Sequence, residues 1–339
     1  TGRAKGVRVA HRALANFLTA MRATLGISAQ DKLLAVTTLS FDIAALELFL
    51  PLTVGACVEL VRRETAMDGA ALLTVLAAAA PTLMQATPAT WRLLLAAGWR
   101  GDHRLKVLCG GEALPRDLAA QLIPRGQALW NLYGPTETTI WSAAAVIESG
   151  ATPITIGQPI ANTQLYLLDA HLQLVPPGAP AELYIGGDGL ADGYHQRPAL
   201  TAEKFIPDQF ASLASSSAGR RLYKTGDLAC YWPDGRIEVL GRLDQQVKVR
   251  GHRIELGEIE AVLGQHPAIR QAAVIAHEAS PGHKYLFAYV VLHDGHELAG
   301  DELRQFLGAK LPSFMVPSGF AALSALPLTP NGKLDRRQL

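Results

Sequence analysis

The first 150 residues alternate helical spacing of apolar positions with short apolar runs. Residues 9–25 have apolar side chains at the spacing typical of an amphipathic helix. Residues 31–42 and 106–110 read as strands, and residues 45–55 as a short helix closed by Pro51 and Gly55. Strands that alternate with helices favour a mainly parallel sheet covered on both faces. The apolar positions of the first helix are Leu14, Phe17, Leu18, Met21 and Leu25.

The pattern changes between Ile154 and Ile237, where short β-rich segments are separated by Pro, Gly and Asp-Gly turns. Strands are predicted over residues 163–170, 181–187 and 235–241. These signals favour a small antiparallel barrel or meander. Residues 211–219, ASLASSSAG, have low complexity and predict a surface loop.

A smaller unit is predicted after Asp244, with helices over residues 258–266 and 301–311 and strands over residues 272–278 and 285–293. The second helix has one apolar stripe, which we interpret as core. The sequence therefore predicts an α/β protein with a large subdomain and a small α+β subdomain. The stripe consists of Leu303, Phe306, Leu307 and Leu311.

Composition is that of an ordinary globular protein of 339 residues, 49% hydrophobic and 18% charged. The formal charge of +1 provides no long-range attraction to nucleic acid or to an anionic membrane. Pro81 and Pro88 interrupt the longest apolar stretch, and no signal-peptide pattern opens the chain, so we expect a cytoplasmic protein. The cysteines have no metal-ligand spacing and predict small apolar filler in a reducing compartment. They are Cys57, Cys109 and Cys230.

Residues 131–140, NLYGPTETTI, are the segment richest in candidate chemistry. A Gly-Pro pair bends the backbone, so that Tyr133 can present its ring to a purine. Thr136 and Glu137 can then face phosphates and Mg²⁺. This combination suits a nucleotide with its metal ion.

Five further motifs occur in a fixed order along the chain. They are TGRAKGV at 1–7, YKTGDL at 223–228, GRLDQQVKVRGHRIELGEIE at 241–260, LPSFMVP at 311–317 and NGKLDR at 331–336. With these motifs the chain resembles, over its whole length, the adenylation domains of nonribosomal peptide synthetases, within the superfamily of acyl-CoA synthetases and luciferases. Six long motifs in order are far more specific than any one of them.

The resemblance implies an AMP-forming ligase that uses ATP and Mg²⁺ to activate an amino acid and releases pyrophosphate. It also implies transfer of the aminoacyl group to the phosphopantetheine thiol of a downstream peptidyl carrier domain, beside an upstream condensation domain. Because the family has a serine-rich half before TGRAKGV, we expect a fragment that lacks part of the large subdomain. The implied divisions are residues 1–241 for the large subdomain, with a barrel region at 154–237, residues 242–244 for the hinge and residues 245–339 for the mobile small subdomain.

Residue roles follow from the same resemblance. The resemblance implies that the tail of the phosphate loop consists of Thr1, Gly2 and Lys5. It implies that the nucleotide pocket is bordered by Gly110, Gly111 and Glu112. Further contacts with the nucleotide are implied for Asn131, Tyr133, Gly134, Asp227 and Arg242. Catalytic roles are implied for Lys333, Thr136, Glu137 and Arg242, with Glu137 as the magnesium ligand, Asp244 as the hinge and Gly251 near the pantetheine tunnel.

The amino-acid pocket is implied motif by motif. Asp42 matches the carboxylate that pairs with the substrate ammonium, and a buried acid needs a cation. Most other positions are bulky, so the pocket resembles that of glycine-activating members, with alanine as second choice. One extra methyl there would cost ~1 to 3 kcal/mol, or roughly 5- to 150-fold in discrimination. The pocket positions are Asp42, Ile43, Leu46, Gln85, Leu108, Gly110, Leu132, Ile140, Trp141 and Lys333.

Each motif taken alone also has a structural interpretation. The 131–140 segment and TGRAKG can be plain turns. Asp42 can be a helix N-cap, and Asp227 can be an acid that caps a turn. Lys333 can be a solvated surface charge. An acyl-CoA or aryl-acid ligase of the same superfamily and an inactive scaffold remain alternatives. Three positions depart from the family pattern, namely Ala44 in FDIA, Asp192 in ADGY and Phe314 in LPSFM. Asp192 puts any contact made by the family arginine in doubt.

Overall fold

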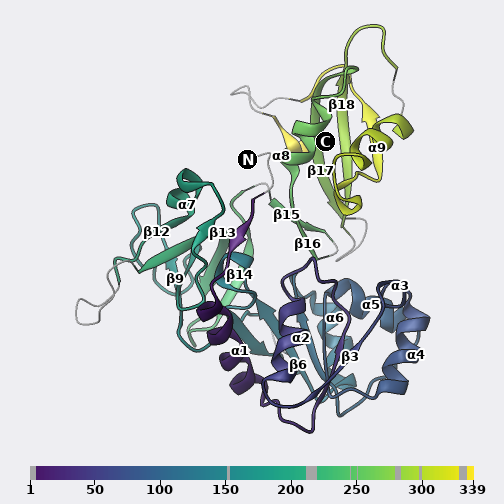
Figure 1. Ribbon diagram of the computed structural model, residues 1–339. Coiled ribbons are helices and arrows are strands. Elements are labelled where there is room, and N and C mark those ends of the chain that lie inside the picture. The colour runs from purple at the N-terminus through teal and green to yellow at the C-terminus, as the bar shows by residue number, and fades with distance from the viewer. Residues whose placement is uncertain are drawn as a thin grey trace. The chain divides into compact units, whose positions relative to one another are not determined.

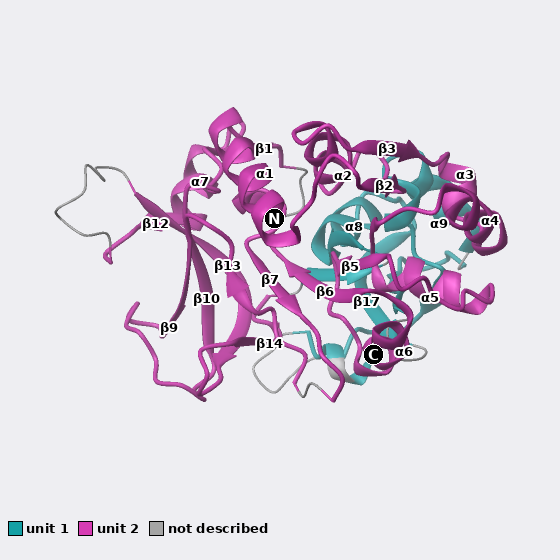
Figure 2. Cartoon of the chain, turned by 90° about the horizontal axis from the view of Figure 1, so that it is seen from below, with its two compact units in different colours: residues 1–4, 245–339 teal, residues 5–244 magenta. Residues whose placement is uncertain are grey.

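The computed structural model describes residues 5–150, 153–210, 220–244, 246–249, 251–278, 284–297, 300–327 and 334–339. Contacts divide the chain into two compact units, with the boundary between Asp244 and Gln245 (Figure 2). The larger unit contains two extended sheets, and each unit has a hydrophobic core of its own. The predicted low-complexity loop at 211–219 lies outside the described residues.

A seven-stranded sheet in the order β3-β2-β4-β5-β6-β7-β8 forms the main layer of the larger unit (Figure 1). The first five strands in that order are parallel, and β7 and β8 are antiparallel to their neighbours. The predicted, mainly parallel sheet is confirmed. Its strands are β2 (Lys32–Ala35), β3 (Cys57–Leu60), β4 (Leu83–Ala86), β5 (Lys106–Gly110), β6 (Ala128–Tyr133), β7 (Ala143–Val146) and β8 (Gln158–Pro159).

Helices cover both faces of this sheet. On one face α1 and α2 pack Phe17 and Leu46 into a buried cluster with Leu108. On the other face α4, α5 and α6 form a second cluster that includes Trp91 and Cys109. Because Leu108 and Cys109 are consecutive on β5, their side chains point to opposite faces. The helices are α1 (His11–Leu25), α2 (Ala44–Leu52), α3 (Arg63–Ala66), α4 (Gly69–Ala79), α5 (Pro88–Ala96) and α6 (Arg116–Leu122), followed by the 3-10 turn η1 (Ile123–Arg125).

Local signals set the helix ends. The α1 helix stops at Gly26, whose φ of 59° lies in the left-handed region that favours glycine. At the start of α4, the Asp68 carboxylate accepts hydrogen bonds from the backbone N–H groups of Ala70 and Ala71. The α2 helix continues through Pro51 and ends at Leu52, between the two residues that were predicted to close it, Pro51 and Gly55.

The second sheet of the larger unit is antiparallel, as predicted for the β-rich region, and it has five strands, two more than the predicted segments. Its longest strand, β13, contains the YKTGDL motif and was not predicted. Nearby, β1 pairs with β11 in a separate two-stranded ladder. The bounds are β1 (Val7–Arg8), β9 (Thr163–Leu168), β10 (Ala181–Gly187), β11 (Gly193–Tyr194), α7 (Pro198–Lys204), β12 (Phe205–Pro207), β13 (Arg221–Tyr231) and β14 (Ile237–Arg242).

The smaller unit packs two helices against a three-stranded sheet and adds a short hairpin. Leu303, Leu307 and Leu311 are buried in its core, as interpreted from the apolar stripe, whereas Phe306 is half-buried, lies outside that cluster and packs on His266. Strand β19 pairs in parallel with β18 and was not predicted. The elements are β15 (Gln246–Val249), β16 (His252–Glu255), α8 (Leu256–Leu263), β17 (Ile269–Glu278), β18 (Lys284–Leu292), α9 (Gly300–Gly308), η3 (Ser313–Met315), β19 (Gly319–Ala322) and η4 (Arg336–Gln338).

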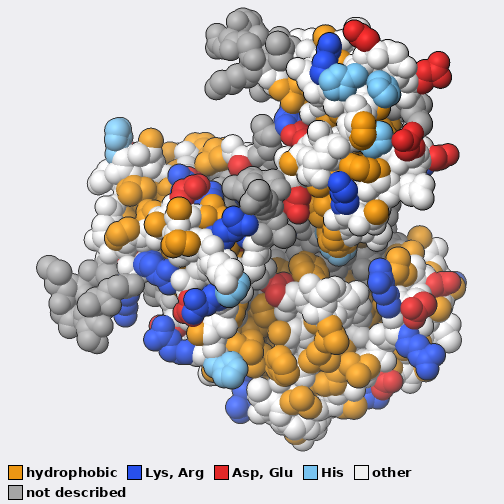
Figure 3. All heavy atoms as spheres, turned by 45° about the horizontal axis from the view of Figure 1, so that its top comes forward, with side chains coloured by type: hydrophobic (Ala, Val, Ile, Leu, Met, Phe, Trp, Pro, Cys, Tyr) orange, Lys and Arg blue, Asp and Glu red, His pale blue; other side chains and the backbone are white. Residues whose placement is uncertain are grey.

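Surface features add little to the fold. Basic and acidic side chains are interspersed on the face shown in Figure 3, in keeping with the near-neutral formal charge. In the described part of the chain, no helix has the length and apolar character needed to cross a membrane. Cys109 is buried as expected for apolar filler, whereas Cys57 is exposed on β3, so the prediction was wrong for that residue.

Candidate active site

The predicted amino-acid pocket lies on one face of the parallel sheet, near the carboxyl ends of its strands. Gln85 on β4 is paired in register with Leu108 on β5, and Gly110 is paired with Leu132 on β6. Leu108 and Gly110 share a face because they are two residues apart. Gln85 is 1% exposed and Leu132 is 2% exposed. Open α/β sheets bind ligands at this edge.

Helix α2 and the residue before it supply two of the predicted pocket positions. Ile43 and Leu46 are buried and belong to the same cluster as Leu108, Leu132 and Trp141. Asp42 is half-buried, and its Oδ2 accepts a hydrogen bond of 2.5 Å from Thr136 Oγ1. The N-cap position of α2 is Ile43, without a side-chain cap bond, so the alternative role of Asp42 as the helix N-cap is not observed.

The loop after β6 carries Ile140 and Trp141 into the cluster. It passes through the 3-10 turn η2 (Thr136–Thr138), after which Thr139 and Ile140 both have positive φ, at 62° and 72°. This region is unfavourable for β-branched residues, so the backbone is strained here. Hydrogen bonds hold the loop, including one of 2.7 Å from the Ser142 N–H to the Tyr133 carbonyl oxygen.

Trp141 is buried among the other predicted pocket residues. The indole is 2% exposed. Its Cη2 and Cζ2 atoms would lie 2.6 Å and 2.8 Å from a Cβ atom added at Gly110, so no larger residue fits there without displacing the ring. Its Nε1–H donates a hydrogen bond of 2.7 Å to Gln85 Oε1. The six-membered ring of the indole therefore packs against Gly110, and its nitrogen is hydrogen-bonded to Gln85.

Glu47 is a buried acid beside this pocket that the sequence analysis missed. Its side chain, 0% exposed, projects from α2 and accepts hydrogen bonds from the Thr37 N–H at 2.9 Å and from the Thr37 hydroxyl at 2.5 Å. Gln85 Nε2 donates to the same carboxylate at 3.2 Å. Burial raises the pKa of Glu47 from 4.5 to about 7, against the lowering effect of these hydrogen bonds. A lone glutamate in the apolar run AALELFLPL was the available signal.

A second acidic group lies at Glu137, the predicted magnesium ligand. Its carboxylate is 0% exposed and accepts a hydrogen bond of 2.7 Å from the Tyr194 hydroxyl. Lys5 Nζ lies 5.4 Å from the centre of the Tyr194 ring. The pairing of β1 with β11 brings the segment that begins at Lys5 to this tyrosine, because Val7 is opposite Tyr194. Tyr194 is thus a second residue that the sequence analysis missed, although it belongs to the ADGY motif.

The residues present fit Mg²⁺ bound together with phosphate oxygens. Mg²⁺ in nucleotide sites usually takes one or two protein carboxylates and completes its shell with phosphate and water. Among the described residues, no group of three or more His, Cys, Asp and Glu side chains is arranged to hold a metal ion by itself. A single carboxylate at Glu137 is consistent with that mode of binding.

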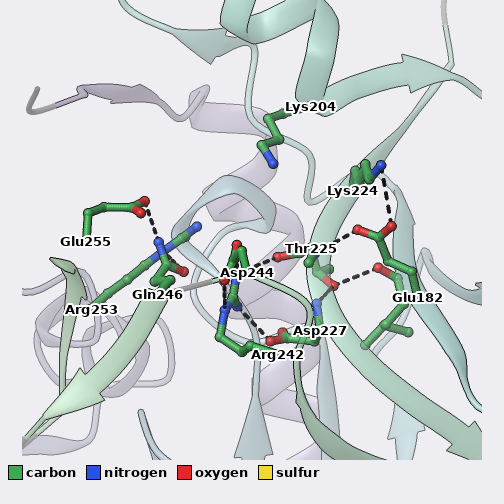
Figure 4. Close-up of polar contacts among 12 residues, drawn as sticks. Glu182, Lys204, Lys224, Thr225, Asp227, Arg242, Asp244, Gln246, Arg253 and Glu255 are labelled. Atoms are coloured by element: carbon green, nitrogen blue, oxygen red, sulfur yellow. Dashed lines mark hydrogen bonds and ion pairs between the residues drawn. The ribbon is translucent and has the colours of Figure 1, made fainter. Parts of the chain in front are cut away.

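The predicted ribose ligand, Asp227, belongs to a chain of polar contacts (Figure 4). Asp227 Oδ1 accepts a hydrogen bond of 2.6 Å from Arg242 Nη1, and its Oδ2 accepts one from the Tyr133 hydroxyl. Arg242 also makes a bidentate contact with Asp244, at 2.7 Å through each of two nitrogens. Burial raises the pKa of Tyr133. The negative charge of the nearby Asp227 carboxylate and its hydrogen bond with Tyr133 raise it further. These hydrogen bonds connect the Tyr133 side chain through Asp227 and Arg242 to Asp244.

Gly226 makes this arrangement possible. Its φ is 77°, within strand β13, and an added Cβ atom would lie 2.9 Å from both Arg242 Nη2 and Asp244 Oδ2. The alternative that Asp227 merely caps a turn is not observed, because Asp227 lies inside a strand and pairs with Arg242 across the ladder.

The other predicted site residues are placed as follows. Gly111, at the end of β5, has a φ of 86°, and Glu112 is half-buried beside it. Asn131 is 6% exposed, and its Nδ2 donates a hydrogen bond of 2.8 Å to the Thr155 carbonyl oxygen. Gly134 approaches the 140–142 backbone so closely that an added Cβ would lie 2.7 Å from Ser142 N. Thr1, Gly2 and Lys333 lie outside the described residues.

The three departures from the family pattern have simple surroundings. Ala44 is buried at the start of α2. Asp192 forms an exposed ion pair of 3.4 Å with Arg8, which contributes little to stability. Phe314 stacks on His252 with ring centres 3.9 Å apart, within the smaller unit. Gly251, beside His252, has a φ of 82°.

Family comparison agrees with this geometry. The model of the AMP-binding enzyme family matches residues 1–195, and that of the AMP-binding enzyme C-terminal domain matches residues 258–333. The chain belongs to the AMP-binding enzyme family. Its relatives include nonribosomal peptide synthetases, as the resemblance of the motifs implied.

Two curated relatives are the dimodular nonribosomal peptide synthase of Bacillus subtilis (strain 168) and tyrocidine synthase 3 of Brevibacillus parabrevis. They are 50% and 43% identical over 340 and 346 residues, which is 100% of this chain in each case. The chain spans only 14% and 5% of their lengths.

Solved structures agree with these matches. A holo four-domain nonribosomal peptide synthetase bound to AMP and glycine is 48% identical over 98% of this chain and 25% of its own, with a TM-score of 0.67. The Vibrio cholerae adenylation domain AlmE, in complex with glycyl-adenosine-5'-phosphate, is 26% identical over 100% of this chain and 64% of its own, with a TM-score of 0.87. The fold is therefore that of adenylate-forming enzymes.

Proposed function

We propose that this chain activates glycine with ATP, as part of an AMP-forming ligase of nonribosomal peptide synthesis. In that reaction a carboxylate oxygen of the amino acid attacks the α-phosphorus, glycyl-AMP forms and pyrophosphate leaves. The observation that carries the proposal is the indole of Trp141, which packs against Gly110 and is bonded to Gln85, in the same set of predicted pocket residues as Asp42. This arrangement leaves little volume for a side chain on the substrate.

The roles of the polar residues follow from charge. Asp42 pairs with the substrate ammonium, and Thr136, its present hydrogen-bond partner, turns to a phosphate oxygen when the substrates bind. Glu137 holds Mg²⁺, which neutralises phosphate charge, while Tyr194 orients the carboxylate of Glu137. Lys5, with Thr1 and Gly2, contacts the outer phosphates.

The nucleoside is held on the other side of the site. Tyr133 lines the adenine, with Asn131 and Gly134 shaping its loop, and Gly110, Gly111 and Glu112 border the same pocket. Asp227 accepts from the ribose hydroxyls and is itself held by Arg242 at 2.6 Å. Asp244 is the hinge residue, since the division between the units follows it.

A second half-reaction is part of the proposal. The phosphopantetheine thiol of a downstream carrier domain attacks the acyl carbon of glycyl-AMP, the thioester forms and AMP leaves. Gly251 lies near the path of that thiol. Solved relatives that pair an adenylation domain with a carrier domain support this step by analogy, namely the artificially fused NpsA-ThdA and holo-PA1221.

Specificity for glycine has support from two solved relatives. The four-domain synthetase binds AMP and glycine, and AlmE binds glycyl-adenosine-5'-phosphate. The first of these is 48% identical to this chain. Alanine is the second candidate, because one methyl is the smallest addition to the pocket.

Amino-acid-dependent ATP–pyrophosphate exchange by the natural protein that contains this sequence tests the proposal. We expect exchange with glycine and none with acetate or with aryl acids, which lack an ammonium group for Asp42. Exchange only with acids that lack an amine would instead show a ligase of the acyl-CoA or aryl-acid type, and no exchange with any acid would show an inactive scaffold.

A substitution of Lys333 tests the two half-reactions separately. If Lys333 bridges the substrate carboxylate and the transferring phosphate, Lys333→Ala should abolish adenylate formation and spare thioester formation from supplied glycyl-AMP. Equal loss of both would refute the bridging role.

A further inference from the structure

Glu47, Gln85 and Trp141 form one buried polar chain that ends at the wall of the predicted pocket. Trp141 Nε1–H donates to Gln85 Oε1 at 2.7 Å, and Gln85 Nε2 donates to Glu47 Oε1 at 3.2 Å. The three side chains are 0% to 2% exposed. They come from α2, from β4 and from the strained loop after β6, so the chain ties together three separate elements.

The orientation of the Gln85 amide decides where the indole lies. An amide has an accepting oxygen and a donating nitrogen, and the two ends can exchange by a flip. In the observed orientation the oxygen faces the indole N–H, while the nitrogen faces Glu47 and, at 3.3 Å, the Ile43 carbonyl oxygen. The flipped amide would place N–H against N–H at Trp141, and a buried donor without an acceptor is costly.

Glu47 selects this orientation together with the Ile43 carbonyl oxygen, and it is the side chain of the two that can be substituted. An ionised carboxylate accepts hydrogen bonds and donates none. The Thr37 N–H and hydroxyl already donate to it, at 2.9 Å and 2.5 Å, and these hydrogen bonds favour the ionised form against the effect of burial. Only the nitrogen end of the Gln85 amide is compatible with such a partner. The amide oxygen is then directed at Trp141.

We propose that Glu47 is a positioning residue for substrate selection, which acts through Gln85 to hold the Trp141 indole over Gly110. This inference rests on the proposed function, because it explains how that pocket excludes larger amino acids. Glu47 itself needs no contact with the substrate. Without its carboxylate, the amide loses its fixed orientation, the indole loses its anchor and the pocket accepts a methyl group more readily.

The test is Glu47→Gln in the natural protein that contains this sequence. An amide at position 47 has one accepting and one donating end, so it conflicts with either the Thr37 N–H or the Gln85 nitrogen. We expect the preference for glycine over alanine, measured as the ratio of kcat/KM in pyrophosphate exchange, to fall roughly three- to tenfold. The fall should appear as a lower KM for alanine and a higher KM for glycine, with a smaller change in kcat.

A matched control separates positioning from general loss of stability. Met84 is the neighbour of Gln85 on β4, is equally buried and packs into the cluster on the opposite face of the sheet. Met84→Ala should lower the unfolding temperature and leave the glycine-to-alanine ratio unchanged. If Met84→Ala shifts the ratio as much as Glu47→Gln does, the positioning role is refuted.

A direct readout is independent of activity. The indole N–H of Trp141 can be followed by NMR in protein with isotope-labelled tryptophan, and its signal is identified by its loss in Trp141→Phe. We expect its hydrogen exchange to be faster in Glu47→Gln than in the unsubstituted protein and in Met84→Ala. Unchanged exchange, with an unchanged substrate ratio, would overturn the proposal.

This readout also distinguishes two kinds of failure. If the unsubstituted protein activates no glycine but Glu47→Gln still accelerates exchange of the Trp141 N–H, the proposed substrate is wrong and the positioning contact stands. If Glu47→Gln does not fold, Thr37→Val removes one donor to Glu47 while keeping the carboxylate, and the same changes are expected with smaller size. No change in Thr37→Val would then refute the proposal.

Discussion

Replacement of the Glu47 carboxylate by an amide should change how the stability of the protein depends on pH. Burial raises the pKa of Glu47 in the folded state to about 7, from an ordinary value of 4.5 that applies to the unfolded chain. Between these two values the folded state binds the proton more tightly than the unfolded state does. The contribution of Glu47 to stability is therefore fully present below about pH 4.5 and is lost as the pH rises through about 7.

The size of the effect follows from the same two values. One pKa unit corresponds to about 1.4 kcal/mol, so the full difference corresponds to about 3 kcal/mol. Between about pH 5 and about pH 8 the free energy of unfolding should fall by about 2 to 3 kcal/mol through this one group. Glu47→Gln cannot ionise and should lack this component.

Urea unfolding of the unsubstituted protein and of Glu47→Gln, at several pH values across this window, measures the difference directly. Other titrating groups contribute equally to both proteins and cancel. The unsubstituted protein should lose stability relative to Glu47→Gln as the pH rises, in agreement with the sign above. A constant difference across the window, or a relative gain with rising pH, would refute the assignment of a raised pKa to this buried carboxyl.

Two further substitutions test the pocket and the phosphate side. In Gly110→Ala the new methyl would lie 2.6 Å from the Trp141 indole, and in the control Gly126→Ala it would lie 2.8 Å from Val107 Cγ2. Thermal unfolding should show that both variants lose about 1 to 3 kcal/mol of stability. Pyrophosphate exchange should fall only in Gly110→Ala. Tyr194→Phe removes the donor to Glu137 and should raise the KM for magnesium–ATP roughly tenfold, whereas Tyr231→Phe, which removes a hydroxyl bonded to the Leu165 carbonyl oxygen, should not.

Much of the fold could be predicted because its signals are local. The apolar positions of 9–25 lie on one face of a single helix, and Phe17, Met21 and Leu25 are buried as that spacing requires. Strand β13 was missed because Gly226 inside YKTGDL indicates a turn, whereas the structure accommodates its φ of 77° within a strand that has a register shift. Strand β19 has only four residues, and its pairing with β18 is set by a distant part of the chain.

The candidate site was predicted from motifs. Motifs indicate the residues that contact the ligand, but they do not indicate the residues that position those side chains. Glu47 and Tyr194 belong to that second group. Glu47 reaches Gln85, 38 positions away in sequence, and Tyr194 reaches Glu137, 57 positions away. Such pairs form only when helices and strands that are distant in sequence pack together. The apolar run around Glu47 was a signal for its burial, but the hydrogen-bond partners of both residues could not be inferred from one sequence.

The size of the pocket is the central claim, and a series of amino acids of increasing size tests it most directly. In pyrophosphate exchange by the natural protein, kcat/KM should be highest for glycine, lower by roughly 5- to 150-fold for alanine, and lower again for valine. Trp141→Leu should reduce these differences, because a smaller side chain then covers Gly110. Equal activity with glycine and valine in the unsubstituted protein would contradict the account.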